Sequence, residues 1–226
     1  MTEVATDVGV TESPRRGEHR WPMALAVLVA AGMRAVLPAS LRLHDAPWLL
    51  VVFVAVMLVV LMIGDPGRIE RQDRWLRVWT QIMIAVITIV NGAAAVQLVA
   101  NILSTKPFTE KPTVLIATGA AIWLTNGIAF ALWYWDLDRG GAAARAHGRG
   151  EPSFVFPEMA NSDLVPRGWV PRFRDYLYLS FNTALAFSPT DVSAVRPWSK
   201  FLMLAEDAIS LVIGILVVAR AVNILK

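Results

Sequence analysis

Three ionisable side chains lie inside stretches of the sequence that are otherwise apolar: Arg34, Glu206 and Asp207. A charge within a bilayer is costly, so it is usually paired with an opposite charge or lines a water-filled path. If every intervening segment spans, all three groups sit at a similar depth, roughly 10 Å from the same membrane surface. We therefore predict a buried ion pair between Arg34 and Glu206 or Asp207. A purely structural pair and a role in ion passage both stay open.

A second group of chemically active residues lies in the segment 173–192, which begins as an apolar run. Its members carry polar groups or interrupt a helix: Asn182, Thr183, Ser188, Pro189, Thr190 and Asp191. Together with Glu206 they are candidates for the lining of a pore or polar path, because so many polar groups are easier to accommodate beside water than beside lipid. The structural alternative is that they form hydrogen bonds between helices.

Signatures of an enzyme are missing from the sequence. The three histidines have no metal-ligand spacing, and the chain has no cysteine, which excludes thiolate catalysis and cysteine-ligated metals. Phosphate-binding and nucleophile motifs are absent, and Asp136 and Asp138 are better explained as a charged helix end than as a catalytic pair. We predict no enzymatic activity, no cofactor, no metal site and no nucleic-acid partner.

The composition requires a membrane protein. Of 226 residues, 56% are apolar and 17% are charged, and the mean hydropathy is +0.52. Five apolar stretches approach the length of about 20 residues that a spanning helix needs. We predict an all-α polytopic transmembrane bundle without strands, its five spanning helices lying at roughly 21–41, 47–64, 77–103, 112–136 and 199–225.

The segment 173–192 is the main topological alternative. Residues 173–187 are predicted to be a sixth helix, either spanning or re-entrant, that is broken near Pro189 because proline removes a backbone donor. Residues 1–20 are predicted to be a disordered tail, residues 21–226 a single transmembrane domain, and residues 136–172 its only sizeable aqueous loop.

The distribution of the 21 basic residues predicts the orientation. If six segments span, most of these residues fall on the side of the N-terminus, the C-terminus and the loop 139–172. The positive-inside rule then places both termini in the cytoplasm, in a multi-pass protein of the inner (plasma) membrane.

The last part of the chain resembles an uncharacterised family of bacterial inner-membrane proteins. The resemblance covers about residues 113–225. It rests on the run from Asp175 to Val192 and on the ending Ala219 to Leu225, with Phe130, Ala131, Tyr134, Phe156 and Pro157 as further marks. It implies a polytopic membrane protein but no established activity.

The same run is similar to the pore helix, filter and inner helix of two-transmembrane-type potassium channels. The matching positions are Tyr178, Ser180, Phe181, Thr183, Asp191, Lys200, Leu202, Glu206, Ile209, Val218, Ala219 and Arg220. The resemblance implies a channel-like homo-oligomer, a tetramer, that conducts small inorganic ions. Both filter glycines are missing from Ala186 to Thr190, so stacked carbonyl rings and potassium selectivity are not expected.

Orientation and channel ancestry conflict at one point. A potassium-channel pore loop enters the membrane from outside, whereas the charges place residues 139–172 in the cytoplasm. The segment 173–192 is then either a full span or a pore loop that enters from the cytoplasm. The function predicted from the sequence is a channel-like transport protein that is not potassium-selective. The alternative is a non-conducting scaffold or partner subunit of another membrane protein.

Overall fold

The computed structural model describes residues 17–41, 48–71, 73–104, 107–161, 163, 165–166, 168–186 and 191–225. The predicted pore residues Ser188, Pro189 and Thr190 lie outside the described residues. Within the described ranges the chain is mostly helical, as predicted. Its elements are α1 Trp21–Gly32, η1 Met33–Val36, η2 Ala39–Leu41, α2 Trp48–Gly64, α3 Arg74–Leu103, η3 Pro107–Glu110, α4 Pro112–Leu137, η4 Asp138–Gly140, α5 Ala142–Ala146, β1 Phe154–Val155, α6 Pro157–Ala160, α7 Phe173–Ala186, β2 Ser193–Ala194 and α8 Pro197–Ile224.

Three of the described helices, α3, α4 and α8, are long and apolar enough to cross a membrane. The apolar helices α1 and α2 have only 12 and 17 residues, so the five long spans that the sequence predicted are not supported. The expected first helix, 21–41, is too long because α1 gives way to the 3-10 turn η1 before Pro38. Proline disfavours a helical conformation of the residue before it.

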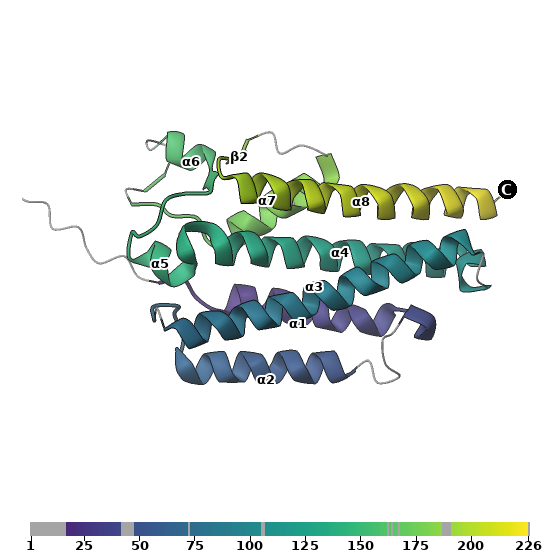
Figure 1. Cartoon of the computed structure of the whole chain (residues 1–226), viewed down its shortest axis with the longest axis horizontal. Coiled ribbons are helices and arrows are strands. Elements are labelled where there is room, and N and C mark those ends of the chain that lie inside the picture. The colour runs from purple at the N-terminus through teal and green to yellow at the C-terminus, as the bar shows by residue number, and fades with distance from the viewer. Residues whose placement is uncertain are drawn as a thin grey trace, which may run out of the picture.

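Helix α4 is the centre of the bundle (Figure 1), and α1, α3, α7 and α8 all pack against it. Its glycines permit close approach: a Cβ atom at Gly119 would lie 2.7 Å from Val217 of α8, and one at Gly127 would lie 3.2 Å from Phe181 of α7. Because lipid offers apolar helices no hydrophobic incentive to associate, close packing of this kind is what holds them together.

One end of the bundle, here called the loop end, carries the start of both α7 and α8. The ring of Phe154 in β1 lies 6.3 Å from that of Tyr176 and 5.9 Å from that of Trp198. Strand β1 also pairs antiparallel with β2, which directly precedes α8. This two-residue pairing corrects the expectation that strands are absent, and it joins the chain before α7 to the chain after it.

Helix α7 runs from the loop end only to the middle of the bundle. Phe181 contacts Trp123, halfway along α4, at a ring distance of 5.7 Å, and Leu185 lines a groove with Gly214 of α8. Figure 1 shows α7 beside the first part of α8 and ending well before α8 does. Since β2 lies back at the loop end, the described parts of this segment, α7 and residues 191–192, favour the re-entrant alternative over a full span.

The first and last described parts of the chain, residues 17–20 and the end of α8, lie at opposite ends of the bundle. Glu18, near the start of the described residues, accepts a hydrogen bond from Trp135 at the loop end, whereas Ala221 packs with Leu41 and Leu115 at the opposite end. The prediction that both termini share one side depended on a spanning segment 173–192 and is not supported by this arrangement.

Residues 17–20, the described part of the predicted tail 1–20, contact other parts of the chain. Arg20 is only 5% exposed and forms a 3.1 Å ion pair with Asp65, while His19 forms a β-bridge with Arg68. The loop 136–172 is also partly packed, because Phe154 and Arg145 are buried in it. A charged composition marked these segments as aqueous, but Arg20 in the first and Arg145 in the second are buried.

We expect Gly119→Ala to destabilise the bundle by about 1 to 3 kcal/mol, the usual cost of overpacking, because Val217 leaves no room for a methyl group. Thermal unfolding of the purified protein in detergent measures the effect. Gly92→Ala is the matched control, since a Cβ atom at Gly92 of α3 meets nothing within 4 Å. The second change Val217→Ala should restore part of the loss, and equal effects at both glycines would contradict the packing argument.

The absence of native cysteine makes the re-entrant path directly testable. Single cysteines at His147, Ser193 and Leu225 occupy exposed positions. An impermeant maleimide should label positions 147 and 193 from one face of the membrane and position 225 from the other. Labelling of position 193 from the face opposite to 147 would show that residues 173–192 span.

Candidate functional site

The candidate site is a carboxyl group buried where α4, α7 and α8 meet. Glu206 of α8 is fully buried. The hydroxyl of Tyr134 donates a 2.5 Å hydrogen bond to its Oε2, and the Ser180 hydroxyl contacts its Oε1. These three residues are called the Glu206 cluster. Glu206 lies nine residues into α8, roughly 13 Å from the start of that helix.

Local periodicity explains why Glu206 points inward. The buried residues of α8 recur every three or four positions: Ser199, Met203, Glu206, Ser210, Ile213, Val217 and Ala221. This spacing places them on one face of a helix. Glu206 therefore occupies a core position whose neighbours along the face are otherwise apolar or hydroxyl-bearing.

The Glu206 cluster contains one hydrogen fewer than its contacts need if the carboxyl group is ionised. The Ser180 Oγ atom lies 2.6 Å from the Gly127 carbonyl oxygen as well as against Glu206. A serine hydroxyl carries a single hydrogen, so only one of these two contacts can use it. A protonated Glu206 supplies the other hydrogen. The geometry thus fits a neutral carboxylic acid, which also avoids the cost of an unpaired buried charge.

Further polar groups continue from the Glu206 cluster toward the middle of the bundle. The Asn126 amide donates a 3.3 Å hydrogen bond to the Ser210 hydroxyl. Thr183 is fully buried, and its hydroxyl has no hydrogen-bond partner among the described residues. The Nδ2 atom of Asn182 is likewise buried without a partner in the described part of the chain. Sequence reasoning had selected Asn182, Thr183 and Glu206, of which the first two lie on α7 and the third on α8.

The other predicted pore residue that the structure describes, Asp191, lies apart from this group. It is exposed at the loop end and accepts a 3.4 Å hydrogen bond from the Tyr178 hydroxyl. Asp207 follows Glu206 but is only half-buried, and its Oδ1 atom finds no partner within the described ranges.

Arg34 and the two acids of α8 are far apart. Arg34 lies in η1, close to Leu37, which packs with Leu115 and Ala221 at the opposite end of the bundle. Glu206 contacts Tyr134, roughly 28 Å along α4 from Leu115. The predicted ion pair is therefore not formed. The depth argument assumed that α8 starts at the end where α1 finishes, whereas β2 and the start of α8 lie at the loop end.

Sequence reasoning missed the partners that satisfy Glu206. Tyr134 was noted only as a mark of a family resemblance, and Asn126 and Ser210 were not singled out. A tyrosine three residues before the end of an apolar helix resembles an interfacial anchor. Its inward orientation becomes evident only when α7 and α8 are placed against α4.

A second buried polar cluster fixes the base of α7 at the loop end. Asp138 accepts hydrogen bonds from the Ser153 backbone N–H at 2.6 Å and from the Tyr176 hydroxyl at 2.5 Å. Arg145 donates to the carbonyl oxygens of Trp135 and Asp138, and its guanidinium lies 4.9 Å from the Tyr176 ring centre. These contacts bind the loop after α4 to the first turns of α7.

Glu18 extends this cluster to the N-terminal segment. It accepts hydrogen bonds from the Trp135 indole and the Phe173 backbone N–H. Burial raises the pKa of Glu18, and the charge of Arg145 partly opposes that rise. None of the described residues forms a group of three histidine, aspartate or glutamate side chains that could hold a metal ion.

We expect Glu206→Gln to be tolerated and Glu206→Ala to be destabilising. A glutamine can donate its amide hydrogen to Ser180 and accept from Tyr134, as a protonated glutamate does. Alanine leaves the Tyr134 hydroxyl without a partner, at a cost of about 1 to 3 kcal/mol, whereas the Ser180 hydroxyl keeps the Gly127 carbonyl. Unfolding in detergent compares the two variants. Infrared difference spectra should show a protonated carboxyl band that Glu206→Gln removes, and its absence from the wild type would contradict the neutral assignment.

Comparison with known proteins adds no relative. No family model, no curated protein and no solved structure matches this chain. The two resemblances drawn from residues 113–225 therefore stay predictions, and the site has to be interpreted from its own geometry.

Proposed function

We propose that this chain is a subunit of a channel-like membrane transport protein, in which α7 and α8 line an ion-conducting path. The observation that carries the proposal is that α7 ends in the middle of the bundle while β2, which follows it in the chain, lies back at the loop end. Backbone that turns back at membrane depth is tolerated only where it is enclosed by protein or borders water. A half-helix that ends mid-bundle beside a long helix is therefore compatible with a water-filled path along α7 and α8.

Unsatisfied polar atoms support a path on this side of the molecule. The Nδ2 atom of Asn182 and the Oδ1 atom of Asp207 are buried without hydrogen bonds to other described residues. Such groups in an apolar environment are costly unless water or another subunit completes them. Both lie on the two helices proposed to line the path.

The surface of α8 supports an oligomer. Only 28% of its most apolar stretch is buried, compared with 67% for α4. The groove between α4, α7 and α8 has a volume of about 540 Å³ and is lined mainly by apolar groups, including Trp123, Leu185 and Ile215. A channel formed by several copies would cover this surface, and the sequence resemblance to potassium channels favours a tetramer.

Charge favours a cytoplasmic loop end in this proposal. Several arginines lie at this end. Arg68 and Arg71 precede α3 and Arg74 begins it, while Arg172 precedes α7 and Arg174 lies in its first turn. The positive-inside rule places that end in the cytoplasm of a cell with an inner membrane. The half-helix then enters from the cytoplasm, and the C-terminus lies on the other side.

The test of conduction is ion flux across liposomes that contain the purified protein. We expect a current with a potassium to sodium permeability ratio well below the order of 100, because a filter lacking both glycines cannot stack four inward carbonyl rings. A ratio of that order would contradict the filter argument. An absence of current in every salt would favour the non-conducting scaffold.

A pair of variants localises the path. Asn182→Leu should change the conductance at least severalfold if α7 borders the path. Gln97→Leu is the matched control, because Gln97 of α3 also has a buried side-chain oxygen without a partner in the described structure but lies outside α7 and α8. Equal effects of the two substitutions would contradict the assignment of the path to α7 and α8.

A further inference from the structure

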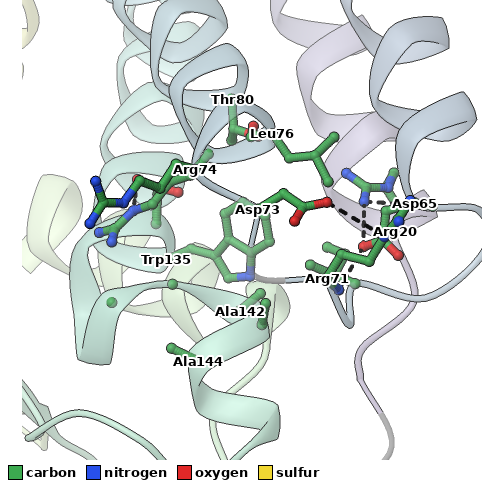
Figure 2. Close-up of a pocket in the computed structure, with 16 residues that line it drawn as sticks. Arg20, Asp65, Arg71, Asp73, Arg74, Leu76, Thr80, Trp135, Ala142 and Ala144 are labelled. Atoms are coloured by element: carbon green, nitrogen blue, oxygen red, sulfur yellow. Dashed lines mark hydrogen bonds and ion pairs between the residues drawn. The ribbon is translucent and has the colours of Figure 1, made fainter.

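The loop end also contains an arginine-lined cavity that the proposed ion path does not use. The cavity has a volume of about 260 Å³ and lies between the start of α3, the end of α4 and the segment before α1. Four arginines line it, and Figure 2 shows Arg74 on one side and Arg71 with Arg20 on the other, with the indole of Trp135 between them. The fourth arginine is Arg77.

Acidic groups neutralise only part of this charge. Arg20 pairs with Asp65 at 3.1 Å, Arg71 with Asp73 at 3.5 Å, and Arg77 approaches Asp136 at 4.0 Å. Arg74 has no ion pair with any of the described acids. Asp136 is also held by a 2.9 Å hydrogen bond from Gln81. The cavity therefore retains an excess of positive charge.

The buried Arg20 provides an independent indication that this cavity suits an anion. Only 6% of its side chain is exposed, and its Nε atom has no hydrogen-bond partner among the residues described. Burial lowers the pKa of Arg20, and Asp65 offsets this effect only in part. A guanidinium with an unused donor beside a cavity is suited to an oxyanion.

The start of helix α3 adds backbone N–H donors and an exposed apolar surface next to the cavity. No side chain caps its N-terminus, and no acidic residue occupies its first turn. Directly beside the arginines, large apolar residues of α3 are exposed at the spacing of one helix face: Trp75, Val78, Trp79 and Ile82. Tryptophans of this kind lie at the level of lipid headgroups. A ligand with a phosphate and an attached acyl chain would match both surfaces.

We propose that this cavity binds the phosphate headgroup of an anionic phospholipid, with Arg74 and Arg77 as its main contacts. The acyl chains extend along the exposed face of α3. The site is distinct from the Glu206 cluster and does not depend on conduction, so it can be tested whether or not the protein forms a channel. Basic pockets between helices at the cytoplasmic surface are suited to such headgroups.

The test titrates the purified full-length chain in non-ionic detergent with phosphatidylglycerol, with phosphatidylcholine of the same acyl chains, or with inorganic phosphate. The readout is the lipid concentration that gives half of the maximal rise in unfolding temperature, because a ligand of the folded state stabilises it. We expect stabilisation by phosphatidylglycerol at much lower concentration than by either other compound. Equal potency of phosphatidylcholine would overturn the proposal, and equal potency of inorganic phosphate would indicate a free-anion site instead.

Two double variants separate a built site from diffuse surface charge. Arg74→Gln with Arg77→Gln should weaken phosphatidylglycerol binding about 30-fold, the effect of two juxtamembrane arginines. Arg174→Gln with Lys200→Gln removes the same charge from exposed positions at the loop end and should change binding less than threefold. Equal weakening by both would overturn the proposal. Arg74→Lys with Arg77→Lys should keep most of the preference, which guards against loss through misfolding.

Discussion

The hydrogen bonding of one buried carboxyl group connects the three helices that define this fold. Glu206 of α8 has Tyr134 of α4 and Ser180 of α7 as partners, and none of these side chains has access to solvent. A polar group in an apolar interior needs hydrogen bonds from its neighbours, because its desolvation otherwise destabilises the fold. The position of α7 relative to α4 and α8 is therefore specified more strictly than apolar packing alone would require.

The base of α7 is specified in the same way. Asp138 and Arg145 hold the chain after α4 against Tyr176, and the pairing of β1 with β2 holds the chain after α7 at the same end. The half-helix is thus fixed at its base by polar contacts and at its middle by Ser180. Glycine at position 127 lets the Ser180 hydroxyl reach the α4 backbone, since a side chain there would meet Phe181.

Helix positions could be predicted from the sequence because each long apolar stretch ends at polar or proline residues. The positions of α2, α3, α4 and α8 follow the predicted ranges closely, but α1 does not, since a hydropathy pattern does not show where a helix tightens into a 3-10 turn. Polar residues of α7 could be selected by type. The partners of buried polar groups could not be predicted, because a pairing by depth, such as that of Arg34 with Glu206, holds only if the topology is known. The direction of α8 depends on β1 and β2, which are too short to leave a pattern in the sequence.

The contacts of Glu206 also set an order of events during synthesis. Its two partners are separated from it by 72 and 26 residues, and both precede it in the chain. Domains assemble progressively as the chain emerges, with N-terminal parts first. Helices α1 to α4 can therefore pack before α7 is synthesised. The pairing of β2 with β1 and the contact of Ser180 with Glu206 can form only after β2 and α8 have left the ribosome. Until then, the Ser180 and Tyr134 hydroxyls have to be accommodated without Glu206, which makes the insertion of α8 the step that completes the bundle.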